Sequence, residues 1–402
     1  MRVLRYLGDN IFVFFLSILS PVLGIFVSFS NCCSRKQVSF PSLFLLFVTL
    51  ALWLSAINAT KIPASDQIAY ANMYYNVPDY SFFEALKFLS YTEGENTDAY
   101  NEPVYKAFCW LGYYITCGKV YWYFALITFI IYLTSFVTIY RLLSYVGYNV
   151  ITILTSIILC AFFFQFVNQT NHAIRQYMAG LIVVYAMVKK TISNKNPWIL
   201  YLLAALMHKS TLLLLLFLMI PTKYAYDKRK VIVLSIVAVL FSYFLSNISS
   251  AMMLIAGEES YVLAKAASES KEFNEMNKII LYGVSMPILY VCYRGLLFRP
   301  NVKENSILYF YLIVTLFTLF VMACGKNTLF QCRYFFYIYF LVPYTIPLLF
   351  STNMSISKSF QKFLCLFFPF HFLYSFYTCI WEYAEVYELL LYPLPLLFNY
   401  QY

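Results

Sequence analysis

Charged side chains are scarce in this sequence. Of its 402 residues, only 11% are Asp, Glu, Lys or Arg, whereas 62% are hydrophobic. Soluble domains carry roughly a quarter charged residues and about half apolar ones. The shortage of charge therefore excludes an ordinary soluble domain with a single anchor, and it indicates a polytopic membrane protein.

The sequence also lacks the short motifs of several enzyme classes. It has three histidines and no His-Glu-x-x-His metal motif, no phosphate-binding P-loop and no Gly-x-Ser-x-Gly motif. None of its ten cysteines belongs to a Cys-x-x-Cys pair, and no zinc-finger or RNA-binding motif is found. We therefore expect no metal, no cofactor and no nucleic-acid partner. Cytoplasmic loops that face anionic lipid headgroups explain the net charge of +10.

Apolar stretches long enough to cross a membrane recur throughout the chain. A backbone in lipid must satisfy its hydrogen bonds within its own segment, so these stretches predict helices. We predict an all-α polytopic membrane protein with about 10–12 transmembrane helices in a single domain over residues 1–402. The spans are expected at 11–29, 40–57, 121–140, 150–167, 173–188, 231–247, 279–293, 306–323, 334–350 and 363–380.

Basic and acidic residues lie in alternate loops. The positive-inside rule assigns the basic loops to the cytoplasm, so the acidic loops 58–120 and 248–278 are predicted to face outside. Segment 198–220 does not fit as one span, because the loops before and after it are both basic. Two short arms joined at His208-Lys209-Ser210 would place both ends in the cytoplasm. An ordinary span with a basic loop on the outer side is the alternative.

The first apolar segment, 11–29, presents the same conflict. Arg2 and Arg5 precede this segment and Arg35 and Lys36 follow it, so both of its ends have a cytoplasmic charge pattern. Either a break at Pro21 and Gly24 divides the segment, or the N-terminus lies outside despite its charge.

A polar run from Asn168 to Tyr177 separates two apolar stretches. Arg175 lies inside the start of the second stretch, and a cationic side chain at that depth usually has a function. Its guanidinium fork matches phosphate oxygens. We therefore predict an outward-facing phosphate or pyrophosphate site here. An arginine that extends to the outer headgroups is the alternative.

The same run predicts a helix N-terminus. We expect a helix to begin near Asn171, capped by Asn168 or Thr170. Its free N–H groups and its dipole would add to the anion site. In such a helix, the side chains of the following polar residues share one face, namely His172, Arg175 and Gln176.

Three further groups are candidates for chemistry. His208 could act as a general base or bind phosphate, or it could only bond a neighbouring helix. Arg333 begins a span and could stabilise developing charge on a diphosphate, or it could contact headgroups. Asp66 and Glu102 could act as acids or bases, although a loop carboxylate is more often simply solvated. His371 is isolated and is read as structural.

Taken together, these fragments resemble the EpsG-like branch of the Wzy polysaccharide polymerases. The order of an outer-loop Asp, a Glu-Pro pair, an Arg-Gln pair, a His and a late Arg-Tyr pair agrees over roughly residues 60–340. The chain departs from the family at Val104, where Gly is frequent, and at Lys209. The matching fragments are Asp66–Tyr70, Asn101–Tyr105, Ile174–Ala179, Leu206–Ser210 and Arg333–Tyr334.

The resemblance implies a metal-independent glycosyltransferase at the outer face of a bacterial inner membrane. It would join oligosaccharide repeat units carried on undecaprenyl pyrophosphate, in contact with membrane lipids, a flippase and a chain-length regulator. Arg175 and Arg333 would bind the donor pyrophosphate, and His208 would accept the proton of the acceptor hydroxyl. The expected substrate-binding residues are Asp66, Tyr70, Glu102, Asn171, His172, Gln176, Ser210 and Tyr334.

Two other functions compete with this one. An O-antigen ligase uses the same kind of donor, but its large outer loop usually comes late in the chain, whereas here it comes early. A lipid-linked glycan flippase or transporter is expected to have charged groups along a central path and pseudo-repeated halves. The sequence has neither feature.

Overall fold

The computed structural model describes residues 2–34, 40–64, 66–90, 102–255, 275–298, 302–324, 328–351, 358–379 and 382–400. These residues form helices and contain no β-strand, which confirms the all-α prediction. The α-helices are α1 (Arg2–Leu19), α2 (Pro21–Ser34), α3 (Phe40–Ala59), α4 (Asp66–Tyr75), α5 (Phe82–Phe88), α6 (Pro103–Ile115), α7 (Val120–Val146), α8 (Val150–Phe162), α9 (Phe164–His172), α10 (Ile174–Ser193), α11 (Trp198–Met207), α12 (Thr211–Leu218), α13 (Lys228–Ile255), α15 (Glu275–Phe298), α16 (Leu308–Ala323), α17 (Thr328–Ser351), α18 (Lys358–Tyr377), α19 (Val386–Leu391) and α20 (Leu394–Phe398).

Several of these helices can cross a membrane. In the described part of the chain, four helices are long and apolar enough, namely Phe40–Ala59, Val120–Val146, Lys278–Phe298 and Asn305–Ala323. The pair α8 and α9, which is bent by 50°, adds a fifth candidate if it is counted as one span. The chain is therefore polytopic, as predicted. The total of about 10–12 spans and the single-domain organisation stay predictions.

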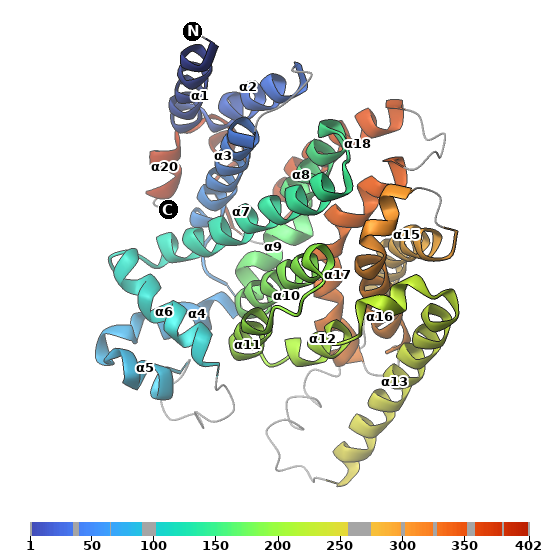
Figure 1. The fold of residues 1–402 in the computed structure, drawn as a ribbon. Helices are drawn as coiled ribbons and strands as arrows, with labels where there is room; N and C mark the ends of the chain where they lie inside the picture. Colours follow the sequence, from blue (N-terminus) through green and yellow to red (C-terminus); the bar gives the residue numbers. More distant parts are fainter. Residues whose placement is uncertain are drawn as a thin grey trace.

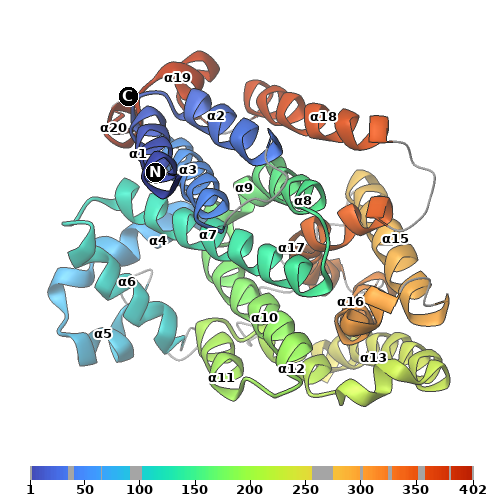
Figure 2. The same ribbon diagram turned by 45° about the horizontal axis from the view of Figure 1, so that its top comes forward.

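Helices α7 to α10 form the middle of the molecule. Figure 1 and Figure 2 both place α4, α5 and α6 on one side of this group and α13, α15 and α16 on the other. Helix α7 packs against α3, α8 and α10, and α17 packs against α8 and α10. The elements on the two sides therefore meet through the middle helices and α17.

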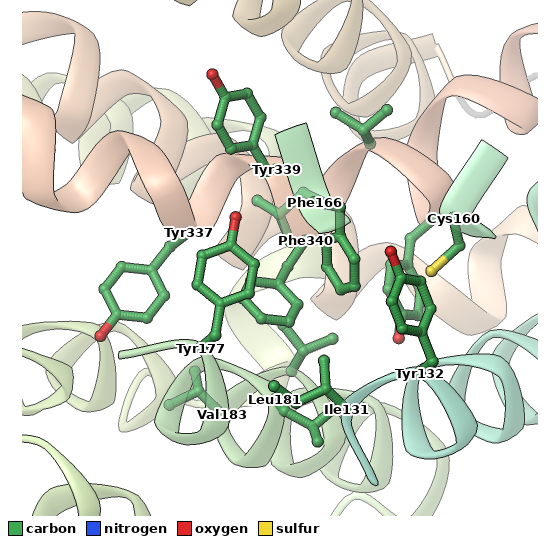
Figure 3. Close-up of a cluster of buried hydrophobic side chains, with 14 of the residues drawn as sticks. Ile131, Tyr132, Cys160, Phe166, Tyr177, Leu181, Val183, Tyr337, Tyr339 and Phe340 are labelled. Carbon is green, nitrogen blue, oxygen red and sulfur yellow. The ribbon is translucent and has the colours of Figure 1, made fainter. Parts of the chain in front are cut away.

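Aromatic rings fill the interior where α9, α10 and α17 meet (Figure 3). Phe166 meets Phe340 edge to face at 4.9 Å between ring centroids, and Tyr177 lies 4.7 Å from Phe340. Gly180 permits this close packing, because a Cβ there would lie 2.9 Å from the Tyr337 ring. Tightly packed rings thus hold α9, α10 and α17 together, and residues of the candidate site lie on these helices.

Segment 198–220 is an interrupted hairpin, as its charge pattern predicts. Lys190, near the end of α10, donates through Nζ to the carbonyls of Leu218 at 2.6 Å and Ile220 at 3.1 Å. The hairpin therefore returns to the end of α10 from which the chain departs toward α11. Its arms of 10 and 8 residues are about 15 and 12 Å long, roughly half the thickness of a bilayer core.

The structure contradicts the predicted helix start near Asn171. The chain there belongs to α9, and α10 begins only at Ile174, after a break at Ala173 (φ −114°, ψ 46°) with no side-chain cap. Thr170 does not cap α10, because its hydroxyl donates to the Val167 carbonyl at 2.6 Å. Hydroxyl bonding back to its own helix is a common alternative to capping.

A break divides the first apolar segment, as one of its two alternatives predicts, and short helices lie in the first loop and in the C-terminal tail. Ser20 separates α1 from α2, and Pro393 lies between α19 and α20. In the first loop, Ser81 and Glu84 form a capping box at the start of α5. The two loops predicted to face outside include residues 91–101 and 256–274, which lie outside the described residues.

Candidate functional site

A buried carboxylate, Glu102, joins two of the predicted site residues. Its Oε2 accepts from Nη1 of Arg175 at 2.6 Å, and its Oε1 lies 2.5 Å from Nδ1 of His208. The backbone N–H of Lys209 also donates to Oε1, at 3.3 Å. Only 4% of Glu102 is exposed. Three segments far apart in the sequence therefore meet at one carboxylate.

Local structure explains how each partner reaches Glu102. Glu102 precedes α6, whose first residue, Pro103, suits a helix start. Arg175 follows the break at Ala173, in the first turn of α10. His208 is extended (φ −160°, ψ 122°) at the tip of the hairpin. Thr211 braces that tip by donating to the carbonyls of Ala204 at 2.9 Å and His208 at 2.8 Å.

Glu102 stays ionised at neutral pH. Burial by itself raises the pKa of a carboxyl group, but the hydrogen bond from His208 and the charge of Arg175 outweigh it, and the pKa of Glu102 is lowered. Arg175 therefore does not extend to headgroups, because its side chain is 15% exposed and is paired with this carboxylate. Its charge is partly neutralised within the protein.

Tyr70 supports Arg175 from α4. The guanidinium carbon of Arg175 lies 5.8 Å from the centre of the Tyr70 ring, which is a cation–π arrangement. Tyr70 is 5% exposed, and burial raises its pKa. Asp66 begins the same helix, is exposed, and lies within electrostatic reach of Tyr70.

The start of α17 holds the hairpin tip. The hydroxyl of Tyr334 donates to the Ser210 carbonyl at 2.9 Å, and the Ser210 hydroxyl lies 2.7 Å from that of Tyr337. Gln176 donates through Nε2 to the carbonyl of Arg333. The Arg333 side chain is exposed. The predicted residues Ser210, Tyr334, Gln176 and Arg333 thus lie together, beside the Glu102 cluster.

His172 and Asn171 are placed differently from the prediction. The break at Ala173 separates His172 from Arg175 and Gln176, so the three residues do not share one continuous helix face. Nε2 of His172 instead lies 2.7 Å from Nζ of Lys61. Asn171 is fully buried. The capped helix N-terminus predicted for this junction is therefore wrong, because α10 begins at Ile174 without a side-chain cap.

Lys61 is a site residue that the sequence interpretation missed. It follows α3, is 0% exposed, and donates to Oε1 of Gln67 at 2.8 Å. Burial lowers its pKa to about 7. The available signal was its position, because Lys61 directly follows a long apolar span and begins a loop in which acidic residues outnumber basic ones.

The Glu102–His208 pair has the geometry of a histidine base with its orienting carboxylate. When Nδ1–H of His208 donates to Glu102, Nε2 is the ring nitrogen that can accept a proton, and the carboxylate stabilises the resulting imidazolium. Among the described residues, no group of three or more His, Cys, Asp or Glu side chains is placed to hold a metal ion.

Comparison with known proteins gives one match. The model of a family described as the EpsG family matches residues 42–392. No curated protein and no solved structure matches the chain. The matched range includes Glu102, Arg175 and His208, together with every other residue predicted for the site.

Proposed function

Because this chain belongs to the EpsG family, we propose that it polymerises oligosaccharide repeat units carried on undecaprenyl pyrophosphate. Membership in the family is consistent with a polysaccharide polymerase, and the helices that can span a membrane are consistent with a lipid-linked substrate. In this proposal the enzyme transfers the growing glycan from its lipid pyrophosphate to a new lipid-linked unit. It works at the outer face of a bacterial inner membrane.

The contact between Glu102 and His208 carries the proposal. The acceptor hydroxyl gives its proton to Nε2 of His208, and its oxygen forms the bond to the anomeric carbon of the donor. The bond between that carbon and the pyrophosphate oxygen breaks, and its electron pair leaves with the pyrophosphate. Glu102 holds the imidazole and stabilises its positive charge. Bulk solvent then takes the proton from His208.

Cations around the Glu102–His208 pair are proposed to bind the leaving pyrophosphate. Lys209 is exposed beside His208, and Arg333 is exposed at the start of α17. We assign the pyrophosphate to these two side chains, since exposed cations are accessible to a phosphate group. Arg175 contributes through Glu102, which its guanidinium orients.

One residue of α4, Asp66, is proposed to hold the acceptor sugar, and a second, Tyr70, assists indirectly. Asp66 is exposed and can accept hydrogen bonds from sugar hydroxyls. Tyr70, one turn further along the helix, contributes by supporting Arg175 at the edge of the same site. This places the acceptor hydroxyl on the α4 side of His208 and the pyrophosphate on the α17 side.

A gel of surface and lipid-linked glycans tests the function. A strain that lacks the gene is complemented with the wild type, with Arg175→Ala or with His208→Gln. His371→Gln is the matched control, because His371 is exposed on α18 and bonds only locally to Ser375 among the contacts described. Immunoblotting of the membranes checks that each variant is present in equal amount.

The outcomes separate the candidate functions. Single repeat units in the deletion strain, with long chains restored by the wild type and by His371→Gln only, support the polymerase. Long lipid-linked chains that never reach their final acceptor would indicate a ligase. A pattern that does not change on deletion would contradict both functions.

A further inference from the structure

A second polar cluster, formed by Lys61, Gln67 and His172, adjoins the Glu102 cluster. Gln67 and Tyr70 are three residues apart on α4, so they lie about one helical turn apart along it. Gln67 contacts Lys61, whereas Tyr70 supports Arg175. His172 likewise precedes Arg175 by three residues, across the break. Helix α4 and the junction of α9 and α10 therefore each contribute one residue to each cluster.

Lys61 determines which nitrogen of His172 carries the proton. Its Nζ lies 2.7 Å from Nε2 of His172 and 2.8 Å from Oε1 of Gln67. An ammonium group has three donors and no acceptor. When Lys61 is protonated, Nε2 must therefore accept, and the proton of the neutral ring must be on Nδ1. This is the less common neutral tautomer of free histidine.

The same contact keeps His172 neutral. A second proton on the ring would place two cations 2.7 Å apart, an arrangement that a buried site strongly disfavours. Lys61 is 0% exposed and so cannot touch a substrate. The His172 ring is partly exposed. Any effect of Lys61 on a ligand therefore acts through a neighbouring side chain, and His172 is a partly exposed neighbour in direct contact with it.

We infer that Lys61 is a positioning residue that holds His172 as a neutral donor, with Nδ1–H directed to an oxygen of the sugar substrate. His172 then binds and orients that oxygen, while His208 moves the proton. The identity of the ligand as a sugar rests on the proposed function. The tautomer and its dependence on Lys61 do not, since they follow from the Nζ–Nε2 contact.

Nitrogen-15 NMR of histidine-labelled full-length protein in lipid nanodiscs tests the tautomer. His208→Gln and His371→Gln are used to assign the His172 signal. At about pH 6, where an amine with a pKa near 7 carries its proton, we expect the Nδ1–H form in the wild type. Lys61→Met should shift the ring to the Nε2–H form or to a mixture, and Lys61→Arg should retain Nδ1–H.

Lys106→Met is the matched control. Lys106 is also a buried lysine, 2% exposed, but its Nζ donates to the Lys87 carbonyl at 3.0 Å. Its removal should leave the His172 tautomer unchanged. An Nε2–H or doubly protonated ring in the wild type would overturn the inference, and so would an unchanged tautomer in Lys61→Met.

Substitution of His172 itself tests the donor without relying on a Lys61 variant that folds. The amide nitrogen of Asn takes about the position of Nδ1, whereas that of Gln takes about the position of Nε2. We expect His172→Gln to raise the KM for the lipid-linked acceptor about tenfold, the value of one good hydrogen bond, and His172→Asn to raise it clearly less. Equal loss in both variants would contradict a donor at Nδ1.

The two proposals fail in different ways. An unchanged glycan pattern in the deletion strain would end the polymerase proposal but leave the tautomer result standing. Single repeat units in the deletion strain, together with an Nε2–H tautomer in the wild type, would support the polymerase proposal and overturn the inference about Lys61 and His172.

Discussion

Two histidines of this protein, in adjoining polar clusters, are held in opposite ways. His208 faces a carboxylate, Glu102, at 2.5 Å, whereas His172 faces an ammonium group, Lys61, at 2.7 Å. A carboxylate favours a positively charged ring and an ammonium group opposes it. The same side chain is thus prepared to take a proton in one place and to donate a hydrogen bond in the other. The partner defines the role of each imidazole.

Among the changes that test this contrast, removal of the Glu102 charge should have the largest effect on activity. Glu102→Gln keeps the shape of the side chain but takes away the charge that orients His208 and balances Arg175. We expect a loss of about 10²–10⁴-fold in polymerisation rate, the usual contribution of a positioned base. The rate is measured with lipid-linked repeat units in vesicles. Asp79→Asn, at an exposed site in the same loop, should be neutral, and an active Glu102→Gln enzyme would refute the role of the pair.

The pH dependence of stability should report on Lys61 in the other cluster, which Lys61 forms with Gln67 and His172. The pKa of Lys61 is lowered to about 7 in the folded protein, against about 10.4 in an unfolded chain. Between these values the unfolded state binds more protons, so stability rises with pH by up to about 1.4 kcal/mol per unit. Below about pH 7 the burial penalty is complete and constant.

Thermal unfolding in detergent from about pH 6 to 9 measures this slope. The wild type should gain stability relative to Lys61→Met above pH 7, because the variant lacks the titrating amine. Parallel curves for the two proteins would show that Lys61 keeps its proton, and the ammonium at His172 would then persist across the whole range.

Arg175→Lys tests whether the shape of the guanidinium, and not only its charge, matters in the Glu102 cluster. Lysine keeps the positive charge but has no planar group to lie over Tyr70 and no fork to orient Glu102. We expect about a tenfold loss of activity, equivalent to about 1.4 kcal/mol. Arg141→Lys is the matched control, because Arg141 also bonds and stacks on a tyrosine, Tyr185, on an exposed surface. Full activity of Arg175→Lys would mean that only its charge matters.

The smallest effect is expected at the hairpin tip. Ser210→Ala removes the hydroxyl that contacts Tyr337 at 2.7 Å and leaves the bond from Tyr334 to the Ser210 carbonyl in place. We expect a loss of about 1 kcal/mol in stability and a few-fold fall in activity, since His208 is two residues away. Thermal unfolding and the vesicle assay measure both. A variant indistinguishable from the wild type in both would mean that the contact between the Ser210 and Tyr337 hydroxyls does not help to position His208.

The interrupted hairpin illustrates how far sequence reasoning reached. Basic residues on both sides of 198–220 favour a chain that turns back at the polar residues His208-Lys209-Ser210, with an ordinary span as the alternative. The bonds from Lys190 to Leu218 and Ile220 confirm that return. Charge distribution could predict it because the cost of placing charge in lipid acts on each segment separately.

The break before Arg175 illustrates where the same reasoning failed. Asn168 and Thr170 are good capping residues, so they predict a helix start near Asn171, but α9 continues through them to His172. A Thr hydroxyl can bond back within its own helix as readily as it caps another one, and local sequence does not decide between the two. Packing between α9, α10 and their neighbours decided it here.

The sequence by itself determined that this is an all-helical polytopic membrane protein of a polymerase-like family, and it predicted an interruption at His208 and a functional role for Arg175. Apolar length, charge distribution and ordered motifs are properties of short segments, and each can be read without its partners. Only the tertiary structure decided that Glu102 joins Arg175 to His208 and that Lys61 faces His172. Each contact joins residues 73 to 111 positions apart. A buried polar group is costly unless it has a hydrogen-bond partner, and that partner is supplied by whichever segment folding brings beside it.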